Sequence, residues 1–182
     1  MKTALLVIDV QMAFVHDDAA GASRSCPEAE QNIAALLSAF HERGDTVIHV
    51  HHHALDPNDP FHADAPGAAV QPFAAPAERE AVVVKHVASA FVGTTLEQDL
   101  RRAGVERLVV CGATANHCAE SSARSASNLG FATIYASDAV WAYGATGPDG
   151  LEHSAEQIHS VTLCNLQGEF ATVLPTKEIL AA

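Results

Sequence analysis

Three residues of different chemical types, Asp9, Lys85 and Cys118, each lie at or just beyond the end of a short apolar run. The thiol of Cys118 could attack an electrophilic carbonyl and form a thioester, which divides one difficult reaction into two easier ones. Asp9 could take the thiol proton and deliver it to the leaving group. Lys85 could keep Asp9 ionised and favour the thiolate by its charge. These residue types predict a hydrolytic site with Cys118 as its nucleophile.

The sequence around Cys118 predicts that this residue lies in the first turn of a helix. Residues 108–111 are apolar and include two β-branched valines, which predicts a buried parallel strand. Gly112 ends this strand, and Asn116 is a candidate N-cap for the helix that follows. Small and apolar residues then recur at helical spacing, namely Ala119, Ser122, Ala123, Ala126 and Leu129. The free N–H groups and the dipole at such a helix start should lower the pKa of the thiol, and they could bind an oxyanion.

Each of the three residues also has a purely structural interpretation. Cys118 could be a small buried residue at a helix start, Asp9 a cap at a strand end, and Lys85 a solvated surface lysine. His117 is not favoured as the base, because neighbours in sequence do not face each other on a helix. A redox pair of Cys118 with Cys111 is not favoured either, because Cys111 lies inside the expected strand.

Strands that alternate with helices predict an α/β fold with a mostly parallel sheet. The expected strands are residues 3–8, 46–50, 81–84, 108–111, 132–136 and 171–174. The expected helices are residues 33–44, 95–103, 116–130 and 151–166, and the expected loops are residues 11–26 and 54–77. Ligands of such sheets bind beyond the carboxyl ends of the strands, where Asp9, Lys85 and Cys118 are expected to lie. The long loop at 54–77 is expected to act as a lid or an oligomer contact.

The composition indicates a globular chain that does not bind polyanions. Its 182 residues suit a single domain, 1–182, and 48% of them are hydrophobic whereas 18% are charged. The formal net charge of −12, without a run of Lys or Arg, argues against nucleic acid and anionic membrane surfaces. The four cysteines have no C-x-x-C spacing, which favours a reducing cytoplasmic location over a disulfide framework. The apolar run before Asp9 is too short for a signal peptide or a membrane span.

Three adjacent histidines follow the second expected strand. His51 and His53 alternate on one side of an extended chain, and Asp59 or His62 could complete a metal site with them. Three adjacent histidines do not by themselves give the spacing of a ligand set, so we expect no bound metal. Residues 144–150 are rich in glycine but contain no Lys, so they predict a turn and not a phosphate loop. We therefore expect no cofactor.

Three segments together resemble those of the isochorismatase-like cysteine hydrolase family. They are ALLVIDVQMAF at the start of the chain, VVKHVASAFVGTTL in the middle, and LVVCGATANHCAESSARSASNLGF after it. The resemblance implies a three-layer αβα fold with a six-stranded, mostly parallel sheet, and a catalytic triad of Asp9, Lys85 and Cys118. It also implies an oxyanion hole made by the backbone N–H groups of Thr114 and Cys118, and a cis peptide bond between Ala113 and Thr114.

The resemblance further implies an activity. The family typically hydrolyses a C–N bond in a small amide, carbamoyl or ureido compound, and its members commonly form homo-oligomers, here expected to be a dimer or a tetramer. Members that hydrolyse isochorismate generally lack the cysteine, so Cys118 argues against that reaction. Nicotinamidases carry Asp-x-His and a further His six residues on as metal ligands, whereas this chain has His51, His53 and Asp59 at those spacings. A metal-assisted nicotinamidase and a catalytically silent member that binds a metabolite or a partner are the alternatives.

Aromatic side chains are candidates for the wall of a substrate pocket. The five in question are Phe14, Phe61, Phe91, Trp141 and Tyr143. Each could equally pack in the core or at an interface, and the sequence does not identify the small molecule that serves as substrate.

Overall fold

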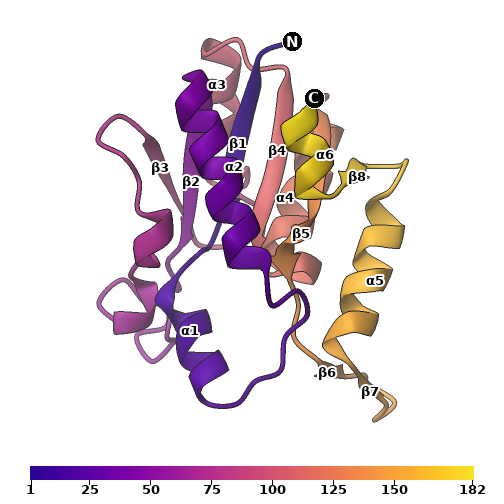
Figure 1. Ribbon diagram of the computed structural model, residues 1–182. Coiled ribbons are helices and arrows are strands. Elements are labelled where there is room, and N and C mark those ends of the chain that lie inside the picture. Colours follow the sequence, from indigo (N-terminus) through magenta and orange to yellow (C-terminus); the bar gives the residue numbers. More distant parts are fainter.

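A six-stranded parallel sheet forms the middle of three layers in the computed structural model, which describes residues 1–182 (Figure 1). The strands stand in the order β3-β2-β1-β4-β5-β8, and every neighbouring pair is parallel. Their bounds are β1 (Thr3–Ile8), β2 (Thr46–His52), β3 (Ala81–Lys85), β4 (Arg107–Ala113), β5 (Ala132–Trp141) and β8 (Thr172–Leu174). A separate antiparallel hairpin consists of β6 (Ala145–Thr146) and β7 (Glu152–His153). The structure confirms the α/β fold with a six-stranded sheet that the sequence predicts.

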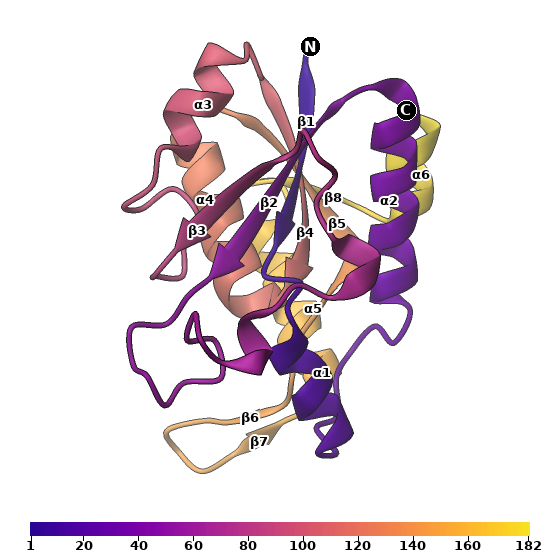
Figure 2. The same ribbon diagram turned by 90° about the vertical axis from the view of Figure 1, so that its left-hand side faces the viewer.

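Helices cover both faces of this sheet (Figure 2). The helices are α1 (Met12–Ala19), α2 (Ala29–Arg43), α3 (Leu96–Arg102), α4 (Glu120–Asn128), α5 (Ala155–Leu166) and α6 (Thr176–Ala181). α2 and α6 pack on one face, α3, α4 and α5 pack on the other, and α1 lies beyond the carboxyl ends of the strands. Leu6 of β1 faces the second group and Leu5 the first, and both are fully buried, as is typical of a central parallel strand. None of the helices is long and apolar enough to cross a membrane.

Several elements differ from the sequence predictions, and neither α6 nor the hairpin of β6 and β7 is among the expected elements. The loop expected at 11–26 contains α1. β5 continues to Trp141 instead of ending at 136, with a register irregularity in its pairing with β4. α5 begins at Ala155 and not at 151, because Ser154 and Gln157 form a capping box that fixes the start of the helix and the preceding residues belong to β7.

Contacts with a distant segment hold α1 in place. The N–H of Met12 donates to the carbonyl of Ala69 at 2.7 Å, and the side-chain amide of Gln11 donates to the carbonyl of Ala68 at 2.9 Å. Only Ala13 within α1 is buried, so this helix lacks the apolar periodicity by which a sequence reveals a helix. The residues that follow β2 therefore pack against α1 at the carboxyl end of the sheet.

Candidate active site

Asp9 leaves the end of β1 with a φ angle of 49°, in the left-handed region that residues other than glycine seldom adopt. Its N–H donates to the carbonyl of Val50 at 2.8 Å, which ties this turn to β2. On the other side β4 comes unusually close, since a Cβ atom on Gly112 would lie 2.0 Å from the carbonyl oxygen of Ile8. Only glycine fits at 112, and its small size brings the end of β1 against the turn that follows β4.

Lys85 and Asp9 form a buried ion pair. The Nζ atom of Lys85, at the end of β3, donates to Oδ2 of Asp9 at 2.7 Å, and the two side chains are 0% and 2% exposed. Lys85 is therefore not a solvated surface lysine. The Nδ1 atom of His52 lies 3.4 Å from the same ammonium group. The Oδ1 atom of Asp9 is buried without a hydrogen-bond partner, so one carboxylate oxygen is free to accept a proton.

Cys118 lies beside this ion pair, and the three groups influence one another. Burial raises the pKa of Asp9 from its ordinary value of 3.8 to about 6, although Lys85 and then Cys118 act to lower it. Burial, followed by the negative charge of Asp9, raises the pKa of the Cys118 thiol to about 12. The predicted lowering of this thiol pKa is wrong, because burial and the carboxylate outweigh the nearby lysine. The thiol is protonated at neutral pH and needs a base, and Asp9 is the carboxylate next to it.

A π-helical turn, Ala115–Ala119, carries Cys118 before α4 begins. Asn116 lies within this turn and does not cap it, because the residue that precedes the turn in an extended conformation is Thr114. The peptide bond between Ala113 and Thr114 is cis. The family resemblance implies an oxyanion hole made by Thr114 and Cys118. Thr114 directly precedes this turn and Cys118 lies within it, at the carboxyl end of β4.

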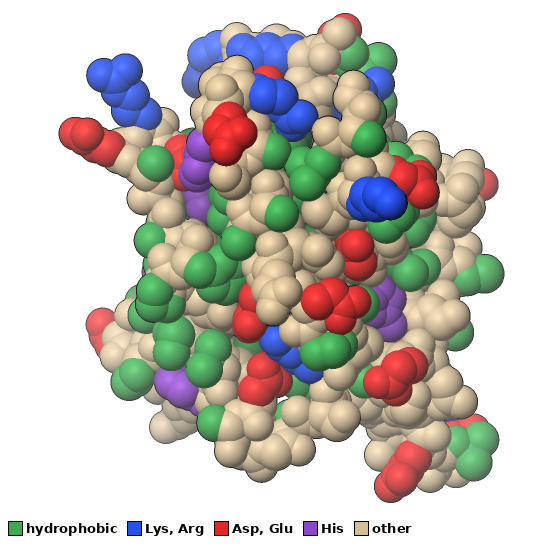
Figure 3. Space-filling view, in the orientation of Figure 1, with side chains coloured by type: hydrophobic (Ala, Val, Ile, Leu, Met, Phe, Trp, Pro, Cys, Tyr) green, Lys and Arg blue, Asp and Glu red, His purple; other side chains and the backbone are tan.

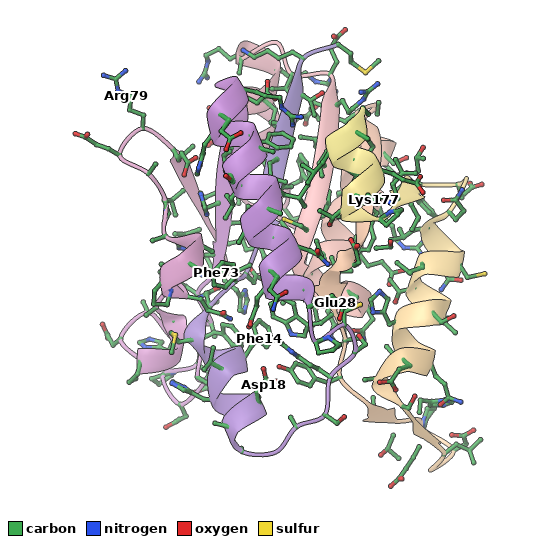
Figure 4. All side chains as sticks on the ribbon, viewed as in Figure 1. Phe14, Asp18, Glu28, Phe73, Arg79 and Lys177 are labelled. Carbon is green, nitrogen blue, oxygen red and sulfur yellow. The ribbon has the colours of Figure 1, made fainter.

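A row of aromatic rings adjoins the ion pair. The ring centroid of His52, which contacts the ammonium group of the pair, lies 5.7 Å from that of Phe61. Phe61 is 5.1 Å from Phe14, which in turn lies 5.6 Å from Trp141 and 6.1 Å from Tyr143. Figure 4 places Phe14 beyond the carboxyl ends of the strands. Four of the five aromatic candidates thus form one cluster, which adjoins the ion pair through His52.

Phe91 does not join this row. Its ring lies 6.2 Å from that of Phe131, which directly precedes β5 at the opposite end of the sheet, and it packs against the core beneath α3 and α4. The chain turns toward α4 after β3, because the N–H of Ala90 donates to Oγ of Ser122 at 3.0 Å. Phe91 is therefore a core contact in this structure and is not placed with the other pocket candidates.

Two residues that the sequence analysis does not single out, Gln11 and His52, hold the site together. The side-chain amide of Gln11 donates to the carbonyl of His52 at 3.0 Å and accepts from the N–H of His52 at 2.8 Å. His52 is also the register partner of Lys85 in the pairing of β2 with β3. Side chains alternate along a strand, so His52 faces the same side as Lys85 while His51 faces the other. The sequence contains a signal for this difference. Val50 is buried, and alternation along the strand places His52 on the same face as Val50 and places His51 and His53 on the opposite face.

The candidate metal ligands, His51, His53 and Asp59, do not form a ligand set. Burial lowers the pKa of His51 to about 4, and its Nε2 atom has no hydrogen-bond partner. The Oδ1 atom of Asp59 instead accepts from the N–H of Phe61 at 2.8 Å. No three His, Cys, Asp or Glu side chains of the chain are arranged to hold a metal ion. The residues present therefore do not fit the metal of a nicotinamidase.

The chain is similar to known proteins over nearly its whole length. A family model described as the isochorismatase domain matches residues 3–178. The isochorismatase family protein YrdC of Bacillus subtilis, whose activity is uncharacterized, is 36% identical over 179 residues, which cover 98% of this chain and 95% of YrdC. A solved structure from Chromobacterium violaceum, assigned as a hydrolase of the isochorismatase family, is 40% identical with a TM-score of 0.95 and covers 100% of this chain and 93% of its own. A cysteine hydrolase from Pseudomonas syringae is 26% identical with a TM-score of 0.90, over 99% of this chain and 91% of its own.

Proposed function

Because the chain belongs to the isochorismatase family and is a hydrolase of that family, we propose that it is a cysteine hydrolase of small C–N compounds. Its substrate is an amide, carbamoyl or ureido compound, and Cys118, Asp9 and Lys85 carry the reaction. The observation that carries this proposal is the buried ion pair of Lys85 and Asp9, 2.7 Å apart, beside the thiol of Cys118. The similarity to a cysteine hydrolase from Pseudomonas syringae supports the same chemistry.

In the first half of the reaction the thiol is acylated. The sulfur of Cys118 attacks the carbonyl carbon of the substrate while its proton passes to Oδ1 of Asp9, the carboxylate oxygen that has no other partner. The negative charge moves to the carbonyl oxygen, where the backbone N–H groups of Thr114 and Cys118 stabilise it. The C–N bond then breaks, Asp9 gives its proton to the leaving nitrogen, and a thioester remains on Cys118.

In the second half water replaces the nitrogen. Asp9, again a carboxylate, takes a proton from a water molecule as its oxygen attacks the thioester carbon. The C–S bond breaks, the proton returns from Asp9 to the sulfur, and the carboxylic or carbamic acid leaves. One water molecule is consumed, and thiol, carboxylate and ammonium groups return to their starting states.

Lys85 sets the pKa of Asp9 for this double role. Burial raises the pKa of Asp9, and the ammonium group lowers it, which leaves a value of about 6. Asp9 is therefore largely ionised at pH 7 and can act as a base, yet its conjugate acid is strong enough to protonate a leaving amine. A carboxyl group of ordinary pKa would be a weaker base, and a buried one without Lys85 would be protonated before the reaction began.

A screen for ammonia release from small primary amides, carbamates and ureas tests the proposal. We expect the wild-type protein to hydrolyse at least one of them and Cys118→Ala to lose turnover by about 10³-fold or more. Cys164→Ala is the matched control, because Cys164 is exposed on α5, and it should retain wild-type turnover. Release of ammonia by Cys118→Ala at the wild-type rate would contradict the proposal.

Treatment with a chelator separates this function from a metal-assisted nicotinamidase. The side chains of His51, His53 and Asp59 do not converge, so we expect turnover to be the same before and after incubation with EDTA. Loss of turnover on chelation, with recovery on addition of Zn²⁺ or Fe²⁺ and no recovery in His51→Ala, would favour the nicotinamidase.

A further inference from the structure

Half of the positive side chains gather at the end of the sheet where the strands begin, opposite to Asp9 and Cys118. The chain has 10 Lys and Arg residues and a net charge of −12. Five of the 10 lie before β1, at the ends of α2 and α3, or at the first position of β4, namely Lys2, Arg43, Arg101, Arg102 and Arg107. Figure 3 shows Lys and Arg side chains collected at the top of the molecule, near the two termini. Acidic partners accompany three of these cations, since Arg43 pairs with Asp45, Arg101 with Glu97 and Arg102 with Asp99.

Most of these cations have a structural explanation. Arg43 lies at the end of α2, pairs with Asp45 at 2.9 Å and covers the ring of Phe40. Lys2 donates to the carbonyl of Ala103 at 2.8 Å, at the end of α3. Cations at these places are expected, because they complement the negative end of a helix dipole. A helix dipole does not explain Arg107, which lies at the start of a strand.

Arg107 is the exception. It is the first residue of β4, it is half-buried, and its guanidinium group takes part in none of the ion pairs of the chain and donates no side-chain hydrogen bond. An arginine is a strong, planar donor that matches a carboxylate, so a half-buried arginine without a partner has unused binding capacity. Only its backbone is engaged, through the N–H that donates to the carbonyl of Lys2 at 3.1 Å.

A cavity of about 330 Å³ opens beside Arg107, between α2, α6 and the starts of the strands. Its charged side chains are Lys2, Arg43 and Arg107 and one carboxylate, Asp45, which pairs with Arg43. The first and last residues of the sequence, Met1 and Ala182, also line it. The rest of its lining is largely apolar, with Phe40, Val109, Ile134, Leu174 and Ile179. A neighbouring groove of about 540 Å³ shares Arg107, Ile134 and Leu174 with it. Volumes of this order are typical of small-molecule sites.

We propose that this cavity binds an amphipathic monoanion, a carboxylate or sulfonate attached to an apolar chain or ring. The anionic head pairs with Arg107 and Lys2, and the apolar body packs against Phe40, Ile134 and Leu174. A neutral ligand would leave the guanidinium group of Arg107 unused, and a purely inorganic anion would leave the apolar lining uncovered. The site lies at the opposite end of the sheet from the triad, so the proposal does not depend on the proposed hydrolase activity.

Titration calorimetry with sodium octanoate tests this site, with 1-octanol and inorganic phosphate as comparison ligands. We expect octanoate to bind the wild-type protein, to bind more weakly as salt is raised, and to bind more tightly than either comparison ligand. Arg107→Gln removes a charge-assisted pair and should weaken octanoate binding by about tenfold or more. Arg107→Lys keeps the charge and should retain part of the affinity.

The control variant is Arg79→Gln, which removes the same charge from a residue that projects away from the body of the protein before β3 (Figure 4). It should bind octanoate as the wild type does, and thermal unfolding monitored by circular dichroism should show that all three variants are folded. Equal affinities of wild type and folded Arg107→Gln would overturn the proposal, as would equal binding of octanoate and octanol, tighter binding of phosphate, or absence of octanoate binding to the wild type.

Discussion

Replacing Lys85 with Met tests the electrostatics of the site through the stability of the protein. The side chains of Lys85 and Asp9 are 0% and 2% exposed, and burial holds the pKa of Asp9 at about 6 even with the ammonium group 2.7 Å away. Methionine keeps most of the apolar volume of lysine and removes its charge. Asp9 then loses the interactions with Lys85 that lower its pKa, and we expect this pKa to rise above 8, as in other buried acids without a partner.

The magnitude follows from proton linkage. A carboxyl group whose folded pKa lies above its unfolded pKa is protonated more readily in the folded state, so it lowers stability as pH rises between the two values. In the wild type this loss runs from 3.8 to about 6 and then ends. In Lys85→Met it continues to pH 8, and two further pH units at about 1.36 kcal/mol each amount to about 2.7 kcal/mol.

Urea unfolding at pH 5, 6.5 and 8 measures this difference as a free energy of unfolding. The gap between wild type and Lys85→Met should widen by about 2.7 kcal/mol from pH 5 to pH 8. Lys177→Met is the control, since Lys177 is exposed on α6 (Figure 4), and it should stay within about 0.5 kcal/mol of the wild type at every pH. Adding Asp9→Asn to Lys85→Met removes the titrating group and should abolish the widening. A constant gap between wild type and Lys85→Met across this range would show that Lys85 does not lower the pKa of Asp9.

Three further predictions concern the thiol, the strand contact and the assembly. The pKa of Cys118 is raised to about 12 and Cys164 is exposed, so iodoacetamide should label Cys164 first in the absence of substrate. Peptide mass spectrometry would identify the labelled residue, and labelling of Cys118 first would contradict the raised pKa. Gly112→Ala should lower the free energy of urea unfolding by about 2–4 kcal/mol, because its Cβ would lie 2.0 Å from the carbonyl oxygen of Ile8; unchanged stability would refute the close contact. We also expect the homo-oligomer that the family resemblance implies, so light scattering should give a multiple of 19.1 kDa, and a mass of one chain would exclude it.

The places of Asp9, Lys85 and Cys118 in the fold follow from a simple rule. Each is preceded by an apolar run that reads as a strand, and parallel strands bring their carboxyl ends to one edge of a sheet. The sequence therefore predicts that Asp9 and Lys85 come together, although they are far apart along the chain, and in the structure they are 2.7 Å apart. The positions of these residues can therefore be predicted from local sequence patterns and the topology of a parallel sheet alone.

The electrostatics of the same residues could not be predicted in this way. The sequence places Cys118 at a helix start and suggests a low thiol pKa, whereas burial and Asp9 raise it to about 12. Burial depends on how the turn after β4 packs against β1, which in turn depends on the absence of a side chain at Gly112. A pKa is set by three-dimensional surroundings that no short segment contains.

The sequence does not predict α1, for a related reason. Its residues contribute a single buried side chain, Ala13, and its start is tied to Ala69 from a distant segment. Phe91 illustrates a different case, because its aromatic side chain makes it a candidate for a pocket wall and equally for the core. The contact of Ala90 with Ser122 turns this part of the chain toward α4, and Phe91 packs beside Phe131 instead. The formation of a helix without a buried face depends on contacts with distant residues. The direction that a side chain takes after the end of a strand depends on such contacts too.

Covalent catalysis by Cys118 can be observed in the mass of the protein during turnover of a slow substrate, quenched in acid. We expect an increase equal to the mass of the acyl group, located on Cys118 by peptide mapping. Hydroxylamine should reverse it, as it reverses a thioester, and Cys118→Ala should not show it. In Asp9→Asn the adduct should form far more slowly, because the thiol has lost its base. An acyl group on a residue other than Cys118, or turnover by Cys118→Ala at the wild-type rate, would show that Cys118 is not the nucleophile.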